Sequence, residues 1–430
     1  MAAARPHPGT KDLPQGFDTG RHRGGNLIEL RTNAVAIGKI VSAARLRGGV
    51  KIKAIEPIAV SLPMRKPVQM SGETVARADN VLLRIESDDG VVGWGEAASA
   101  PLMTGETVAS MMAAVEHMTP TLLTRSADDF AGAAAAMAAR LYGNSAAKAA
   151  IEIALHDLVG RATNRPVYAL LGARPRSRMP VLAVVGSTDA AGDIREAQER
   201  FAAGYRAFKI KVGLSSAQAD AERTRRICVA LKQASRDCLV SADANQGFSV
   251  EAALHYVGAL GDCGLDFFEQ PVAAQDLDGK CLEAMARVAA ASRVPIGADE
   301  GIHSRDDIAR HHQTKAARGV SLKAIKLGGL RAVLEASLLC ERLGMKVNIS
   351  CKTGESSVAS AAAAHVAAAV PALAWGLTVT NSGLAEDVVV APLHVERGHV
   401  ELSDRPGLGI EVDERRVRRG QQEFSARKVA

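Results

Sequence analysis

The chain has 430 residues, of which 47% are hydrophobic, so it can form two domains or one barrel with additions. No apolar run reaches the roughly 18 residues that span a bilayer, so we expect no membrane partner. The net charge of +6 is compatible with nucleic-acid binding, but residues 1–49 contain eight Lys/Arg and only three Asp/Glu. The rest of the chain is therefore nearly neutral, and it has few aromatic residues. Both features argue against a nucleic-acid-binding surface.

The first 49 residues contain Gly, Arg and Pro without periodic apolar residues, and ordered sequence begins at Val50. We therefore expect residues 1–49 to be a disordered leader. They lack the apolar segment before a small-residue cleavage site that a secretory signal contains. The six cysteines are dispersed and form no C-x-x-C pair, which is typical of reduced thiols and indicates a cytoplasmic protein.

Residues 50–177 are predicted to form an α+β domain. Strand-like sequence over about 51–100 includes a hairpin, whose turn is Asp88-Asp89-Gly90 between two apolar runs. Helical stretches with Ala- and Met-rich faces follow over about 105–160.

Residues 178–390 repeat a strand followed by a helix. Such units of about 30 residues imply a parallel sheet covered on both faces, and about eight of them close a barrel. An open doubly wound sheet is the alternative, but no G-x-G-x-x-G follows the first strand. The predicted strands are Val181–Val185, Ala207–Val212, Cys238–Ala242, Leu265–Phe268, Val294–Gly297, Gly319–Ile325 and Lys346–Ile349.

Three consecutive predicted strands are followed by a carboxylate: Asp243, Glu269 and Asp299, which are 26 and 30 positions apart. That spacing is one β–α unit each time, so the three acids should stand at the same height on the C-terminal face of the barrel. Adjacent anions repel one another unless a cation joins them. Oxygen ligands favour a hard ion such as Mg²⁺, whereas separate helix caps and surface acids are the alternative.

Two other predicted strands carry lysines. Lys209 and Lys211 share one face of their strand because side chains alternate along a strand. Lys323 and Lys326 stand in a strand predicted to end before Gly328-Gly329. Ammonium groups inside a barrel cost free energy unless carboxylates lie beside them, so we expect these lysines near the acids.

Five motifs occur in order: Lys209-x-Lys211, Asp243-Ala244-Asn245, Glu269-Gln270-Pro271, Asp299-Glu300 and Lys323-x-x-Lys326-x-Gly-Gly. Together they resemble the muconate-lactonizing subgroup of the enolase superfamily, in the mandelate racemase/muconate lactonizing enzyme family, over about residues 51–413. The resemblance implies an α/β fold, a (β/α)7β TIM-like barrel with an α+β N-terminal capping domain. Residues 391–430 would be a C-terminal segment that returns to the capping domain.

The resemblance also implies roles for the site residues. The three strand-end carboxylates would bind Mg²⁺ or Mn²⁺, and Lys211 and Lys323 would face each other across the substrate as acid/base groups. Lys209 would orient Lys211 or contact the substrate carboxylate. Asn245 and Glu300 would support the metal ligands.

Differences from other subgroups of this family reduce the range of possible substrates. No His follows the strand after Lys323, which disfavours the mandelate-racemase subgroup, and the Asp-x-Asp of dipeptide epimerases is absent near the last strand. Lys352 is unusual for a pocket wall and either meets a second anionic group or is exposed. It is grouped with Asn381 as a candidate substrate-binding residue. Two segments, Met64–Arg77 and Ser99–Glu106, are expected to cover the site.

The function predicted from these residues is Mg²⁺-dependent removal of the proton α to a carboxylate through an enediolate. The product would be a racemised, epimerised or cycloisomerised carboxylic or amino acid. The alternative is dehydration of a β-hydroxy acid such as cis-3-hydroxyproline, since it begins with the same step. A non-catalytic barrel is disfavoured because the motifs are intact. The expected partners are a small carboxylate substrate and further copies of the chain in a homo-oligomer.

Overall fold

The structure, a computed structural model, describes residues 49–429 except for residues 71–72, 173–177, 187–189 and 275–279. The leader predicted over residues 1–49 therefore lies outside the described residues, apart from Gly49.

An antiparallel three-stranded sheet begins the described chain, in the order β1 (Ile52–Met70), β2 (Glu73–Ser87) and β3 (Val92–Ala98). The predicted hairpin is the β2–β3 pair. Its turn contains Gly90 at φ 78°, a left-handed conformation that glycine adopts without a Cβ clash.

Helix α5 (Ser145–Ala162) packs against this sheet and is buried along most of its length. The approach is closest at Gly95 of β3, where an added Cβ would lie 2.0 Å from the main-chain oxygen of Ala150. Only a glycine therefore fits at that position. The other helices of this α+β unit are α3 (Val108–Leu123), α4 (Phe130–Arg140) and α6 (Val167–Leu170).

The second sheet has eight strands in the order β5 to β12, and each strand lies parallel to the next along the chain. A bridge between Val181 and Leu377 joins its two ends, so the sheet forms a barrel. The strands are β5 (Leu182–Val185), β6 (Ala207–Lys211), β7 (Leu239–Asp243), β8 (Phe267–Glu269), β9 (Ile296–Ala298), β10 (Gly319–Leu322), β11 (Lys346–Ser350) and β12 (Leu377–Thr378).

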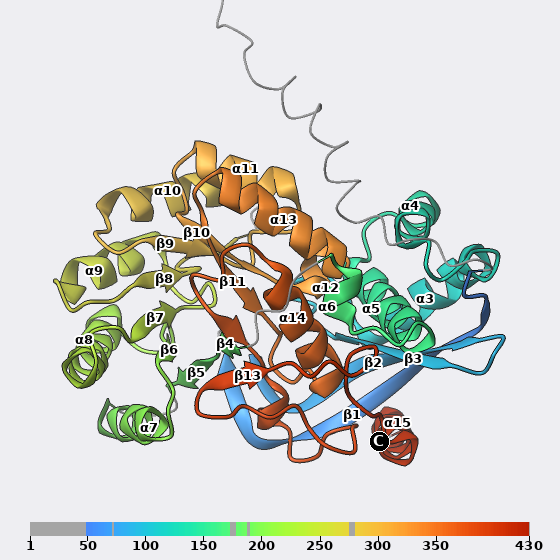
Figure 1. Ribbon diagram of the computed structural model, residues 1–430. Helices are drawn as coiled ribbons and strands as arrows, with labels where there is room; N and C mark the ends of the chain where they lie inside the picture. Colours follow the sequence, from blue (N-terminus) through green and yellow to red (C-terminus); the bar gives the residue numbers. More distant parts are fainter. Residues whose placement is uncertain (1–48, 71–72, 173–177, 187–189, 275–279, 430) are drawn as a thin grey trace, which may run out of the picture. The chain divides into compact units, whose positions relative to one another are not determined.

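Helical segments connect successive strands and surround them, which confirms the predicted (β/α)7β barrel (Figure 1). Helix α9 begins directly after Ser249, which caps its N-terminus by accepting a hydrogen bond from the nitrogen of Ala252. The barrel helices are α7 (Ala190–Ala202), α8 (Ala217–Ala234), α9 (Val250–Leu260), α10 (Cys281–Ala291), α11 (Arg305–Gln313), α12 (Ala324–Leu327), α13 (Leu330–Arg342) and α14 (Ser357–Ala369).

The predicted strand boundaries differ from the observed ones by up to three residues, and the largest difference is at β10. The strand predicted over Gly319–Ile325 ends at Leu322, and Lys323 immediately precedes the short helix α12. Main-chain bonds from Leu327 and Gly328 back to Lys323 and Ala324 close this turn. A short apolar run is compatible with strand or helix, and the local pattern does not separate them.

The C-terminal part of the chain contacts both units. Strand β13 (His399–Glu401) pairs with β4 (Arg178–Pro180) beside the barrel. Helix α15 (Glu414–Val429) lies against β1 (Figure 1). Its ion pairs to the sheet are Arg418–Glu56, Arg427–Asp79, Glu423–Arg77 and Glu414–Arg84.

All six cysteines lie in the described part of the chain and are free thiols. Among the described residues, no helix combines the length and apolar character needed to cross a membrane.

Candidate active site

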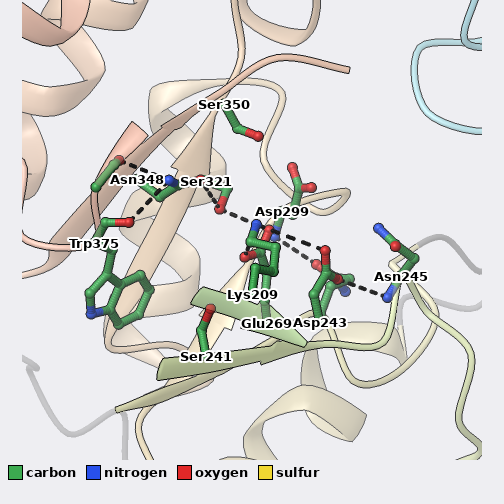
Figure 2. Close-up of polar contacts among 12 residues, drawn as sticks. Lys209, Ser241, Asp243, Asn245, Glu269, Asp299, Ser321, Asn348, Ser350 and Trp375 are labelled. Carbon is green, nitrogen blue, oxygen red and sulfur yellow. Dashed lines mark hydrogen bonds and ion pairs between the residues drawn. The ribbon is translucent and has the colours of Figure 1, made fainter. Parts of the chain in front are cut away.

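The three predicted carboxylates stand side by side at the C-terminal ends of neighbouring strands. Asp243 is the last residue of β7 and is paired in register with Glu269, the last residue of β8. Glu269 is paired with Gly297 of β9, and Asp299 follows that strand immediately. Figure 2 shows the three acids together, and all three are at most 2% exposed according to their accessible surface. The common height predicted from their spacing is therefore present.

Strand β6 brings two lysines to these acids. Lys209 Nζ lies 2.6 Å from Glu269 Oε2 and 3.8 Å from Asp243 Oδ2 (Figure 2). Lys211 Nζ donates to Asp243 Oδ2 at 2.7 Å and to Asn245 Oδ1 at 2.5 Å. Lys209 is buried, whereas the side chain of Lys211 is 16% exposed and so reaches the open end of the barrel.

Two further lysines hold Asp299. Lys323 donates to Asp299 Oδ2, and Lys326 donates to Oδ1 at 2.6 Å. Lys326 also donates to the main-chain oxygen of Ser321 at 3.1 Å and is fully buried. The sequence motif contained Lys326, but no role had been assigned to it.

Charge pairing sets the protonation of these groups. Burial alone would raise the pKa of Asp243, but the ammonium groups of Lys211 and Lys209 outweigh it and hold that pKa below its usual value. Burial opposes the charged form of Lys323 as well, yet the Asp299 and Glu300 carboxylates raise its pKa above the usual range. Lys323 is therefore an ammonium group in this arrangement.

The carboxylates of Glu269 and Glu300 behave differently. Burial raises the pKa of Glu269; Lys209 opposes this shift, and the nearby Asp243 and Asp299 add to it. Burial and then Asp299 raise the pKa of Glu300 to about 7. Asn245 links the two sides of the site, because its amide nitrogen donates to Glu300 Oε1 at 3.1 Å while its oxygen accepts from Lys211.

In the part of the chain that the structure describes, no three His, Cys, Asp or Glu side chains form a ready-made metal site. Instead, the ammonium groups of lysines form ion pairs with the carboxylates. The donor set nevertheless fits a hard divalent cation, because three buried carboxylates converge from adjacent strands. Moreover, Glu300 Oε2 is buried and accepts no hydrogen bond, whereas Glu269 Oε2 has the Lys209 ammonium group 2.6 Å away. Additional positive charge would satisfy the Glu300 oxygen.

A cavity of about 130 Å³ opens above the charged groups. Its floor includes five predicted residues besides Lys209: Lys211, Asp243, Asn245, Asp299 and Glu300. Both predicted covering segments contribute to it, since Val68 comes from the first and Ala100, Leu102 and Met103 come from the second. The remaining wall residues include Lys323, Val184, Ser350, Lys352, Thr353, Thr378 and Thr380.

The two predicted substrate-binding residues of the last strands differ in position. Lys352 lines the cavity. Asn381 does not: it lies in the short 3₁₀ helix η1 (Asn381–Gly383), and its amide donates to Ser357 Oγ and to the main-chain oxygen of Leu393. The geometry gives no support to a substrate contact by Asn381, because its side chain joins the start of helix α14 to the main chain at Leu393.

Other supporting residues were missed. Gln270 accepts a hydrogen bond from the main-chain nitrogen of Asp299 at 2.9 Å and so fixes the position of that acid. Ser321 donates to Glu269 Oε1 at 2.9 Å and also lies 3.1 Å from Asn348 Oδ1 (Figure 2). Gln270 stood in a quoted motif, whereas Ser321 carries no signal in the sequence besides its place on β10.

Comparisons with known families agree with this arrangement. A family model described as "Enolase C-terminal domain-like" matches residues 193–416, and one described as "Mandelate racemase / muconate lactonizing enzyme, N-terminal domain" matches residues 54–172. The chain belongs to the mandelate racemase/muconate lactonizing enzyme family of the enolase superfamily. The predicted family is thus confirmed. Enzymes of this family generally use a divalent metal.

Several relatives in this family are similar over most of the chain. The N-succinyl-L-Arg/Lys racemase of Bacillus cereus is 32% identical over 369 residues, covering 85% of this chain and 96% of that protein. Its crystal structure gives a TM-score of 0.79. The muconate lactonizing enzyme from Pseudomonas fluorescens, solved with muconolactone, gives 0.80 at 30% identity and covers 86% of this chain and 99% of the other.

A third relative is the dipeptide epimerase from Cytophaga hutchinsonii, solved with Mg and the dipeptide D-Ala-L-Val. It gives a TM-score of 0.76 at 27% identity and covers 85% of this chain and 96% of the other. The proteins similar to this chain are isomerases, namely racemases, epimerases and cycloisomerases. This confirms the predicted enzyme class.

Proposed function

We propose that the chain catalyses 1,1-proton transfer, that is racemisation or epimerisation, at the carbon next to a substrate carboxylate. The observation that carries this proposal is the placement of Lys211 and Lys323. Lys211 ends β6 and Lys323 follows β10, and these strands are four positions apart in an eight-stranded barrel. The two amines therefore stand on opposite sides of the cavity, where each can serve one face of the carbon.

The charge balance supports this role. The four site lysines, at positions 209, 211, 323 and 326, face four carboxylates, at positions 243, 269, 299 and 300, so the described groups are balanced before any ligand binds. A divalent cation held by Asp243, Glu269 and Asp299, for which we propose Mg²⁺ with Mn²⁺ as a substitute, would neutralise the charge that develops on the substrate carboxylate. The resulting excess of positive charge suits a carboxylate substrate.

Lys211 and Lys323 have defined tasks in this scheme. The amine on one side takes the proton from the α-carbon, and the ammonium on the other side returns a proton to the opposite face. Asn245 orients Lys211 through its side-chain oxygen. Lys209 neutralises the buried carboxylates of Glu269 and Asp243, and Leu102 and Met103 give the cavity an apolar wall.

We infer that the substrate class is a small carboxylic acid with an α-proton, such as an N-acylated amino acid. The name of the Bacillus cereus relative supports this class. Cycloisomerisation is the second candidate, because the muconate lactonizing enzyme gives an equally high TM-score. The relatives give no support to the dehydratase alternative.

We also propose that the capping unit spans residues 50–177 and the barrel residues 178–390, with residues 391–430 returning to the cap. The separate matches at 54–172 and 193–416 support the division between the capping unit and the barrel. A cytoplasmic location is supported by the six free thiols, and a homo-oligomer is proposed alongside it.

The experiment that tests the function is incubation in D₂O with Mg²⁺ and a set of N-acyl amino acids of both configurations and muconate-type acids. NMR then follows α-deuteration and loss of double bonds, and polarimetry follows the change of optical rotation. We expect α-deuteration with inversion for at least one N-acyl amino acid. Lactone formation without α-exchange would favour the second candidate, and absence of any reaction would contradict the proposal.

A further inference from the structure

We infer that Ser321 is a positioning residue that makes the proposed cation site select small cations over large ones such as Ca²⁺. Its hydroxyl holds Oε1 of Glu269, so that this acid leaves its other oxygen, Oε2, for the cation. This role rests on the proposed function, because it requires a cation bound by Asp243, Glu269 and Asp299, and it adds a specificity to that site.

The three strand-end carboxylates are held in the same way. In each, one oxygen accepts from a fixed donor, and the other pairs with a lysine that lines the cavity. The fixed donors are the main-chain nitrogen of Asn245 on Asp243 Oδ1 at 2.9 Å, Ser321 Oγ on Glu269 Oε1 at 2.9 Å and Lys326 Nζ on Asp299 Oδ1 at 2.6 Å. The cavity lysines are Lys211 on Asp243 Oδ2, Lys209 on Glu269 Oε2 and Lys323 on Asp299 Oδ2. Each acid therefore leaves one oxygen on the side of the cavity lysines.

The hydroxyl of Ser321 lies between two acceptors inside the barrel. Ser321 is 1% exposed, and its Oγ lies 2.9 Å from Glu269 Oε1 and 3.1 Å from Asn348 Oδ1 (Figure 2). A serine hydroxyl has one proton to donate, and a carboxylate is a stronger acceptor than an amide oxygen. The proton therefore points to Glu269, and any rotamer that turned the hydroxyl away would lose both acceptors.

Asn348 is fixed on the far side of this hydroxyl. Its amide nitrogen donates to the main-chain oxygens of Trp375 at 3.1 Å and Gly376 at 2.8 Å, so the amide cannot flip without losing both bonds (Figure 2). The ring of Trp375 is in turn stacked on Phe267, with the ring centroids 3.9 Å apart. The amide oxygen of Asn348 therefore stays beside Ser321, which keeps the hydroxyl in the rotamer that reaches the carboxylate.

The held oxygen of Glu269 matters for the size of the cation. Ca²⁺ takes more oxygen ligands than Mg²⁺ and often binds both oxygens of one carboxylate, whereas Mg²⁺ is smaller and requires near-octahedral geometry. With the hydroxyl in place, Glu269 keeps one orientation and offers Oε2. Without the hydroxyl, the carboxyl group could rotate. Rotation would weaken the site for a small cation and give a large cation a second oxygen.

The test replaces Ser321 with alanine and follows Mn²⁺ binding to the full-length protein by electron paramagnetic resonance, with Ca²⁺ as a competitor in the same titration. Ser321 is the fixed donor to remove, because it is an uncharged side chain and its loss leaves the charge of the site unchanged. We expect Ser321→Ala to weaken Mn²⁺ binding by about 10-fold or more, as is usual when the hydrogen-bond partner of a metal ligand is removed. Ca²⁺ affinity should change by less than about threefold, because a second carboxylate oxygen compensates. Ser321→Thr keeps the hydroxyl and should keep most of the preference for Mn²⁺.

The matched control is Ser241→Ala. Ser241 is a buried serine two residues before Asp243 on β7, and its hydroxyl donates to the main-chain oxygen of Phe208 at 3.0 Å rather than to a carboxylate. This variant should leave the ratio of Mn²⁺ to Ca²⁺ affinity unchanged, and thermal unfolding shows whether the two alanine variants lose comparable stability.

The outcomes separate the role of Ser321 from the proposed reaction. An unchanged ratio in Ser321→Ala, or an equal change in Ser241→Ala, would overturn the role of Ser321 and leave the reaction standing. A wild type that prefers Mn²⁺ through Ser321 but exchanges no α-proton would overturn the reaction and leave the role of Ser321 standing. A wild type that binds no Mn²⁺ would overturn both.

Discussion

Glu96 on strand β3 and Ser356 at the start of helix α14 join the capping sheet to the barrel. Glu96 Oε1 accepts from the main-chain nitrogen of Ser356 at 2.9 Å, and Oε2 accepts from its hydroxyl at 2.6 Å. Glu96 also accepts from Asn80 Nδ2 at 2.7 Å and from the nitrogen of Ala359 at 3.0 Å. One buried carboxylate therefore caps a barrel helix and fixes the loop beside the cavity.

Replacing Glu96 with alanine should destabilise the protein by about 3 kcal/mol or more, because several buried donors lose their acceptor at once. Urea unfolding measures the change. Ser249→Ala, which removes an exposed cap from α9, is the control and should cost only about 1 kcal/mol. Equal effects of the two substitutions would show that Glu96 is an ordinary helix cap.

Half-reactions can separate the roles of the two lysines proposed to be catalytic. In Lys211→Ala, overall racemisation should fall by about 10²–10⁴-fold, the usual contribution of a general base. The variant should still exchange the α-proton of one enantiomer with solvent deuterium through Lys323, and Lys323→Ala should show the reverse preference. NMR of both enantiomers in D₂O provides the measurement. Near-normal exchange in both variants would rule out the two-lysine scheme.

Removal of divalent metal should abolish turnover, and Mg²⁺ or Mn²⁺ should restore it. Glu269→Gln should weaken Mn²⁺ binding, followed by electron paramagnetic resonance, by at least tenfold, because it removes one of three charged ligands. Asp266→Asn is the control, since Asp266 lies just before the same strand and pairs with Lys232 instead. Full activity after exhaustive chelation would show that the acids serve only as partners for the lysines.

Stability should depend on pH through Glu355. Burial, and then the neighbouring Glu96 carboxylate, raises the pKa of Glu355 to about 7. A carboxyl group whose pKa is raised on folding stabilises the protein below its unfolded pKa, and this contribution is lost as the pH rises through about 7.

Glu355→Gln should therefore match the wild type near pH 4.5 and exceed its stability above pH 7, by at most about 3 kcal/mol. Thermal unfolding of both proteins across this pH range gives the comparison. Glu411→Gln, an exchange of an exposed acid, should show no such trend. A constant difference between Glu355→Gln and the wild type at every pH would mean that Glu355 titrates normally.

The sequence predicted the site residues whose positions depend on the strands that carry them. Asp243 and Glu269 were placed correctly because each ends a short buried strand, and parallel strands end at one face of the barrel. Lys323 was assigned to a strand that in fact stops one residue earlier, because helix α12 uses the same apolar residues. Asn381 was predicted to contact the substrate, but it lies in a 3₁₀ helix made of Asn-Ser-Gly, residue types typical of turns, and its side chain is bonded to Ser357 and to the main chain of Leu393.

The cavity wall depends on contacts between distant parts of the chain. Leu102 and Met103 of the capping unit line the same cavity as Lys352 of the barrel, and the spacing of these residues in the sequence does not predict that they lie together. The same holds for Glu96 and Ser356, which are 260 positions apart. Predictions from one sequence are strongest where neighbours in space are also neighbours in sequence or lie one repeat away.

Helix α15 has a consequence for biosynthesis. It extends beyond the family match, which ends at residue 416, and Gly420 approaches the side chains of Val60 and Leu62 on β1 so closely that an added Cβ would lie 3.2 to 3.3 Å from them. When the whole barrel has emerged from the ribosome, helix α15, which packs on β1, has not yet been synthesised. During translation the apolar side chains of Val60 and Leu62 on β1 stay exposed until helix α15 has been synthesised. Chains truncated before α15 should therefore bind chaperones.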